Sequence, residues 1–123
     1  MQNQQRMGFT LIEVLVVVLI LGVLSVIALP SYLNSVYTAR KGTANANARA
    51  IATAVQSRAI TKSAYDTTLS DYATDLGGAI PMNPCTGTTS GYTIAATATT
   101  ATITPQAGTG CGTWVPTTYA VTL

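Results

Sequence analysis

Glu13 is the residue whose chemistry most needs an explanation. It lies near the start of the apolar run "GFTLIEVLVVVLILGVLSVIALP", residues 8–30, and it is the only charged residue between Arg6 and Arg40. A carboxylate placed in hydrocarbon costs about 2.5–3.5 kcal/mol even on the gentler insertion scales. A segment that served only as an anchor would have no use for this group, so the sequence predicts a functional role for Glu13.

Groups suited to catalysis or metal binding are few. The chain has no histidine, the commonest general base and transition-metal ligand. Asp66, Asp71 and Asp75 invite a calcium site, but their spacing does not match an EF-hand loop, and solvated or helix N-terminal acids explain them better. No Gly-rich phosphate loop is present. We therefore expect no enzyme, no metal and no cofactor.

The segment that must position Glu13 is long enough to span a bilayer. As a helix, residues 9–29 would rise about 31 Å. A secretory signal would have a shorter apolar core followed by a small-x-small cleavage site, whereas Pro30 and a further helical pattern follow here. We expect the apolar segment to be kept in the mature protein.

Beyond the apolar run the helical pattern continues and becomes amphipathic. Apolar positions recur at steps of three, four or seven up to about residue 61. Gly22, Pro30 and Gly42 are weak points, and Pro30 should kink the helix. We predict one helix of about 50 residues, which must bury its exposed half against something outside the chain. Its predicted buried stripe is Tyr37, Ala44, Ala48, Ile51, Val55 and Ala59.

After Lys62 the sequence becomes that of a small β-rich head. "TLSDYATDLGG" predicts a short helix with Thr68 as its cap and Gly77 at its end. β-Branched alternation over residues 91–105 predicts a two-stranded hairpin, and "TYAVTL" predicts a last strand. The fold class is thus α+β, a long N-terminal helix whose C-terminal half packs on a small antiparallel sheet. The residues expected to share inward faces are Leu69, Tyr72, Leu76, Ile94, Ala101, Ile103, Tyr119, Val121 and Leu123.

The stretch "G-FTLIEV", followed by an apolar helix ending in "ALPSY", resembles the class III signal of type IV prepilins and type II secretion pseudopilins. The resemblance covers about the first 32 residues. It implies that a prepilin peptidase cleaves after Gly8 and methylates the new amine of Phe9. Glu13 matches the glutamate at the fifth mature position, and Pro30 matches the helix-kinking proline.

That resemblance also divides the chain. Residues 1–8 would be a cleaved leader, residues 9–29 the transmembrane and filament-core half of the helix, and residues 30–123 the exported head. Cleavage would give Phe9 a cationic amine one helical turn before Glu13, and each charge lowers the cost of the other in lipid. Pairing within one chain is possible, but pairing with the amine of a neighbouring subunit would also fix the axial register between subunits. The alternative is a stray glutamate that reaches the membrane interface.

Cys85 and Cys111 are the only cysteines, and 25 residues lie between them. A disulfide closing such a loop stabilises an exported domain by roughly 3 kcal/mol. The alternatives are two buried free thiols or half a metal site, although no Cys-x-x-Cys spacing is present. A disulfide-bounded C-terminal loop also resembles type IV pilins. "IPMNPCTG" lacks the Pro-Trp-Gly signature usual in the major pseudopilin with its calcium loop, and this favours a pilus subunit.

The basic residues and threonines have simple interpretations. Five basic residues of the predicted helix form a solvated face or salt bridges to neighbouring subunits. A DNA-binding patch is an alternative, since some pili serve DNA uptake, but the five are widely spread. Nine threonines in residues 86–104 indicate exposed strands, with O-linked sugar as a weaker alternative. The basic residues are Arg40, Lys41, Arg49, Arg58 and Lys62.

The expected orientation rests on two opposing signals. Arg6 alone precedes the apolar run, while Arg40, Lys41 and Arg49 follow it, and this bias favours an N-terminus outside the cell. The resemblance implies a cytoplasmic leader, and a disulfide needs the oxidising side. We therefore expect an inner-membrane precursor with a periplasmic head, which later joins an extracellular filament.

The expected function is that of a structural subunit of a type IV pilus-like filament, which in such families serves motility, adhesion or DNA uptake. Implied partners are copies of itself or other pilins, prepilin peptidase, the inner-membrane assembly platform and the secretin. A type II secretion pseudopilin is the alternative within the family. A membrane-tethered binding module is the alternative from another class, and it predicts that Glu13→Ala leaves function intact.

Overall fold

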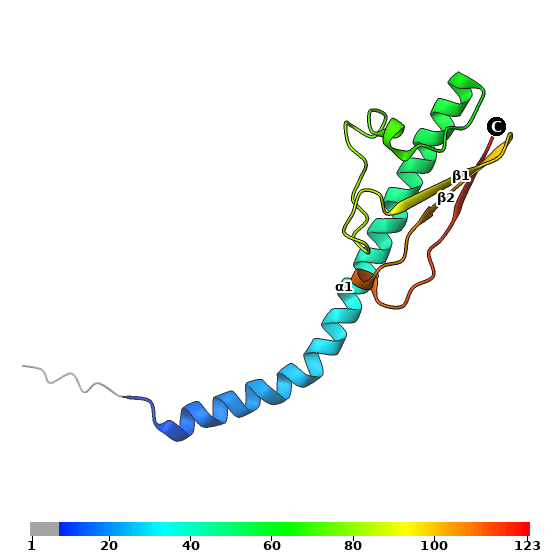
Figure 1. Ribbon diagram of the computed structural model, residues 1–123. Coiled ribbons are helices and arrows are strands. Elements are labelled where there is room, and N and C mark those ends of the chain that lie inside the picture. The colour runs from blue at the N-terminus through cyan, green and yellow to red at the C-terminus, as the bar shows by residue number, and fades with distance from the viewer. Residues whose placement is uncertain (1–7) are drawn as a thin grey trace, which may run out of the picture. The chain divides into compact units, whose positions relative to one another are not determined.

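The computed structural model describes residues 8–123, and its fold is α+β, as predicted (Figure 1). Residues 1–7 of the predicted leader, residues 1–8, lie outside the described residues. The chain divides into two compact units, one ending at Ser35 and the other formed by Val36–Leu123. The elements in chain order are the helix α1 (Leu11–Lys62), the 3₁₀-helix η1 (Leu69–Tyr72), the strands β1 (Tyr92–Ala96) and β2 (Thr100–Pro105), the 3₁₀-helix η2 (Thr109–Cys111) and the strand β3 (Tyr119–Thr122).

Helix α1 confirms the prediction of one long helix. It has 52 residues and continues through Gly22, Pro30 and Gly42. It ends after Lys62, where Ser63 takes a φ of 54°. A left-handed residue at this position is a common way to end a helix, because it turns the chain away from the helix axis.

The N-terminal unit presents an apolar surface on all sides of the helix. Its most apolar stretch has a mean hydropathy of 3.0 and no buried residue, which makes α1 long and apolar enough to cross a membrane. The Ser25 hydroxyl donates to the Leu21 carbonyl at 2.7 Å, so this polar side chain is satisfied within the helix. Such internal pairing is what a hydrocarbon environment requires.

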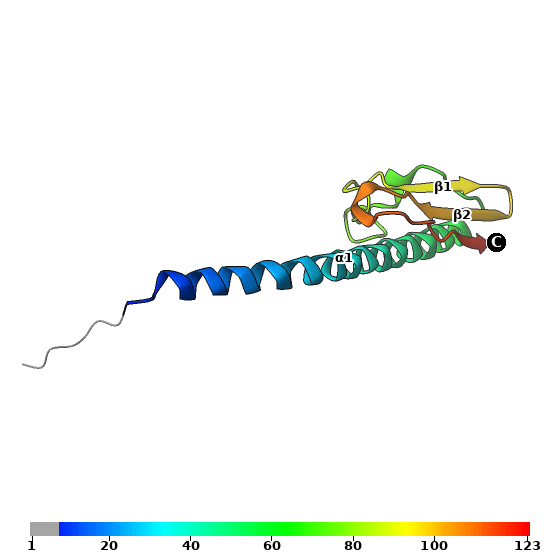
Figure 2. The same ribbon diagram turned by 90° about the horizontal axis from the view of Figure 1, so that it is seen from below.

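In the head, the predicted stripe of α1 supplies one face of the hydrophobic core. Ala44, Ala48, Ile51, Val55 and Ala59 are buried, which confirms the helical period. Tyr37, the first residue of the predicted stripe, is only half-buried. Because three of the five are alanines, the sheet can approach the helix closely, and Figures 1 and 2 show its strands lying along this face of α1.

The sheet has three antiparallel strands in the order β1-β2-β3, so β1 and β3 are its edges. Ile94 pairs with Ile103 and Ala101 with Val121. The first three are buried, as the alternation predicted, and Tyr119 and Val121 pack partly buried against the same core. Leu123 was wrongly placed on this inner face, because it lies beyond β3 and is half exposed.

The helix expected between Thr68 and Gly77 is wrong beyond its first turn. Only η1 is helical, and turns follow it. Thr68 makes no side-chain cap bond; instead, Asp66 Oδ1 accepts the Thr68 backbone N–H at 3.0 Å. This contact satisfies the backbone N–H of the residue that precedes η1. Tyr72 is nonetheless buried, and Leu69 and Leu76 pack against the core as expected.

The C-terminal loop is held to the rest of the head by Cys85 and Cys111, which form the disulfide expected from the sequence. A Cβ on Gly108 would lie 2.2 Å from the Cys85 carbonyl oxygen, so only glycine fits there. The buried Asn83 donates its amide to the Gly91 carbonyl at 2.7 Å and accepts the Cys85 N–H at 2.9 Å. These contacts tie the loop to the end of the hairpin.

Candidate functional site

Thr10 and Glu13 form a reciprocal capping box at the start of α1. The Thr10 carbonyl accepts the Val14 N–H at 3.4 Å, which makes Thr10 the N-cap. Its hydroxyl oxygen accepts the Glu13 N–H at 3.3 Å, and Glu13 Oε2 accepts the Thr10 backbone N–H at 2.9 Å. Two of the donors that a helix start leaves unpaired are thereby satisfied.

The same carboxylate oxygen also accepts the Thr10 hydroxyl at 3.0 Å. Both bonds therefore converge on Oε2 of Glu13, and among residues 8–123 no donor to Oε1 is found. Hydrogen bonds to a charged group are worth more than neutral ones and offset part of the cost of placing it in an apolar segment. The capping box thus holds Glu13 in one position with one oxygen free for a cation.

The predicted processing site precedes this capping box. Nothing lies within 4 Å of the position that a Cβ would take on Gly8, and Phe9 is 87% exposed. The peptide bond between them is therefore open to an enzyme. A shallow hollow of about 270 Å³ follows, lined by Phe9, Glu13, Val14, Val17 and Val18.

Thr10 is a site residue that the sequence interpretation missed. The signal was present, because "TLIE" has the threonine and glutamate at the spacing of a capping box ahead of an apolar run. The sequence interpretation considered only the charge of Glu13, although this residue is also a local hydrogen-bond acceptor. Pro30, the other predicted assembly residue, lies inside α1.

Three basic residues of the head, Arg40, Lys41 and Arg58, contact loops of their own chain while Arg40 remains exposed. Arg40 Nη1 donates to the Gly110 carbonyl at 2.8 Å, and Lys41 Nζ donates to the Thr113 carbonyl at 3.3 Å. Arg58 lies 3.7 Å from an Asp75 carboxylate oxygen. These partners are far away in sequence, so no local pattern could have predicted them.

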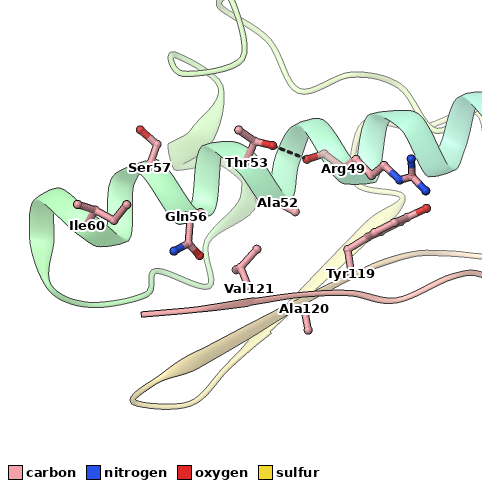
Figure 3. A pocket seen from close by; sticks show the side chains of 9 residues that line it. All are labelled: Arg49, Ala52, Thr53, Gln56, Ser57, Ile60, Tyr119, Ala120 and Val121. Carbon is pink, nitrogen blue, oxygen red and sulfur yellow. Dashed lines mark hydrogen bonds between the residues drawn. The ribbon is translucent and has the colours of Figure 1, made fainter.

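Arg49 has surroundings different from those of Arg40, Lys41 and Arg58. Its guanidinium lies over the Tyr119 ring, 5.2 Å from the centroid, at the edge of a groove between α1 and β3 (Figure 3). The groove has a volume of about 720 Å³. It is lined by Arg49, Ala52, Thr53, Gln56, Ser57, Ile60, Tyr119, Ala120 and Val121.

The three aspartates of the head do not form a metal centre. Across residues 8–123, no group of three or more His, Cys, Asp or Glu side chains is arranged to hold a metal ion. The Thr68 backbone N–H holds the pKa of Asp66 below its usual value, and a hydrogen bond with Asp71 acts in the same direction. Asp75 faces Arg58.

The chain is similar to known proteins, and one family matches its N-terminal segment. The family described as "Prokaryotic N-terminal methylation motif" matches residues 7–29. The type IV major pilin protein PilA of Myxococcus xanthus is 35% identical over 96 residues, which are 78% of this chain and 40% of that protein. The type II secretion system core protein G of Pseudomonas aeruginosa is 38% identical over 68 residues, 55% of this chain and 48% of that protein. The matched segments thus span less than half the length of either relative. No solved structure matches the chain.

Proposed function

Because this chain carries the N-terminal methylation motif and is homologous to a type IV pilin and a type II secretion pseudopilin, we propose that it is a structural subunit of a type IV pilus-like filament. Processed subunits pack their apolar helix halves side by side in the filament core. The heads, residues 30–123, form the filament surface. Residues 1–8 are the leader that is removed.

The observation that carries this proposal is a pre-positioned acid on an otherwise apolar helix. Cleavage after Gly8 leaves the Phe9–Thr10 peptide intact, so the capping box survives processing. The free Oε1 of Glu13 then accepts the methylated amine of Phe9 from a neighbouring copy. In hydrocarbon this charge pair forms only with the right partner at the right height, which sets the axial register between subunits.

The exposed apolar helix surface explains how such a subunit leaves the membrane. From Phe9 to Leu33 the large apolar side chains are exposed to the surroundings of the single chain. Transfer from lipid to neighbouring helices never exposes this area to water, which would cost about 25 cal/mol per Å². The precursor sits in the inner membrane with its leader in the cytoplasm and its head in the periplasm.

Assembly requires partners besides the subunit itself. Prepilin peptidase removes the leader and methylates Phe9, the inner-membrane platform adds subunits, and the secretin passes the filament to the cell surface. Two observations favour a pilus over a secretion pseudopilus. The match to the pilin covers more of the chain than the match to the pseudopilin, and the Cys85–Cys111 disulfide closes a pilin-like C-terminal loop.

Electron microscopy of fibres sheared from cells, with N-terminal sequencing of their subunits, tests the proposal. We expect fibres whose subunit begins with N-methyl-Phe9. The control is Gly8→Val, which should abolish both cleavage and fibres while the precursor stays in the membrane. Subunits that still begin with Met1, or a head released as a monomer, would contradict the proposal.

A further inference from the structure

Two arginines on opposite sides of α1 have similar surroundings with one difference. Arg49 and Arg58 are nine residues apart, which places them about 180° apart around the helix. Each guanidinium lies over a tyrosine ring, Tyr119 at 5.2 Å for Arg49 and Tyr72 at 5.4 Å for Arg58. Arg58 also has the carboxylate of Asp75 at 3.7 Å, whereas within residues 8–123 Arg49 has no carboxylate partner.

The carboxylate side chains of the head all lie in one segment of the chain. All three of its carboxylates, Asp66, Asp71 and Asp75, belong to the loop that follows α1, and they outnumber the cations beside them, Arg58 and Lys62. Figure 1 shows η1 and the turns after it on the side of α1 away from β3. Arg49 stands on the β3 side over Tyr119, whereas Asp75 lies beside Arg58, so this cation and this carboxylate lie on different surfaces of the head.

The surface beside Arg49 also has an uncovered apolar area. The groove beside Arg49 has apolar walls formed by Ala52, Ile60 and Val121 (Figure 3). Ile60 is 66% exposed, so its apolar side chain is open to a partner. The side-chain amide of Gln56 donates a hydrogen bond to the Thr122 carbonyl at 2.7 Å, which joins α1 to the end of β3.

We propose that this groove, with Arg49 at its edge, docks the Asp75 turn of a second copy of this chain, an inference that rests on the proposed filament function. Charge complementarity between Arg49 and Asp75 identifies the occupant. Because the groove and the Asp75 turn are different surfaces of the head, the contact is head-to-tail and repeats without closing, as a filament requires. Arg49 and Arg58 differ by about 13 Å along the helix axis, so parallel copies offset by about 13 Å place Asp75 opposite Arg49.

Disulfide trapping in assembled fibres tests the contact. The double variant Arg49→Cys with Asp75→Cys is expressed as the full chain, and its oxidised sheared fibres are run without reductant. We expect a ladder of dimers and higher oligomers. The matched control is Arg40→Cys with Asp75→Cys, since Arg40 lies on the same side of α1 as Arg58, and this pair should give monomers. Fibres without a ladder from the first pair, or with equal ladders from both, overturn the inference.

Charge reversal gives a second readout. Arg49→Glu should lower the yield of sheared fibres at least about tenfold, while Arg49→Lys keeps the yield close to that of the unmodified chain. The cleaved, disulfide-bonded subunit in the membrane fraction reports that the head still folds. Full fibre yield from Arg49→Glu overturns the docking contact and leaves the filament function standing. Absence of fibres from the unmodified chain would instead contradict the proposed function.

Discussion

At the residue scale, Glu13 combines two tasks that are usually separate. As the third residue of α1 it accepts the Thr10 N–H and hydroxyl, as in a soluble helix. As the only acid in an apolar surface it is also the natural partner of a cation. In the proposed filament the two tasks would use different oxygens of one carboxylate, so the local hydrogen bonds would not compete with the partner cation.

Replacing Thr10 tests the local task alone. Thr10→Val removes both hydroxyl bonds of the capping box and should destabilise the helix start by about 1 kcal/mol. We expect normal cleavage and a several-fold lower fibre yield, measured on sheared fibres against the cleaved membrane pool. Thr10→Ser keeps the hydroxyl and should restore the yield. Equal yields from the valine and serine variants would show that the capping box is not used in assembly.

At the element scale, the head depends on small residues in α1. Ala44 and Ala48 are completely buried, while Ala46 is exposed. The sheet can therefore lie close to the helix on one side only. The same alanine-rich sequence thus provides helix propensity throughout and close packing on a single stripe.

Substitution of one buried alanine should show this asymmetry. Ala48→Leu overpacks the interface between α1 and the sheet and should lower the free energy of unfolding by about 1–3 kcal/mol. Ala46→Leu is the matched control and should leave it within about 0.5 kcal/mol. Thermal unfolding of the full chain in detergent micelles, followed by circular dichroism, measures both. Equal melting temperatures for Ala48→Leu and Ala46→Leu would contradict the packing of the sheet on the Ala48 side of α1.

The tyrosines of the core make the head sensitive to alkali. Burial raises the pKa of Tyr72 and of Tyr92, so the folded state favours the neutral phenol. Above a pH of about 10 the unfolded chain loses these protons and the native head retains them, so stability should fall as pH rises beyond that value. Melting temperatures at pH 8 and pH 11 measure the effect, and Tyr72→Phe should reduce the drop. A melting temperature that stays constant up to pH 11 would contradict the burial of these side chains.

The sequence predicted the elements that follow from periodic patterns and failed where distant segments meet. The helical stripe around Ile51 and the hairpin around Ile103 were readable because burial imposes a fixed period on each. The helix expected at Thr68 forms only its first turn, η1, and the point at which it stops is not set by a periodic pattern. The bonds from Arg40 and Lys41 to the C-terminal loop depend on the tertiary fold and left no local signal.

At the scale of the whole molecule, the chain joins two units made for different surroundings. One presents an apolar helix with a single acid, and the other is a disulfide-bonded head with its own core. This division suits a protein that waits in a membrane and then works outside it. In the function proposed above, the charge of Glu13 links the membrane state to the filament state.

The fibre yield of Glu13 variants, measured against the cleaved subunit in the membrane fraction, tests this account most directly. Glu13→Gln keeps the capping box and removes the charge, and Glu13→Val removes both. Losing one partner of a buried charge pair costs about 3–5 kcal/mol, so we predict that both variants are inserted and cleaved but lose fibres by more than about a hundredfold. A fibre yield from Glu13→Val equal to that of the unmodified chain would contradict the proposed role of Glu13 in assembly.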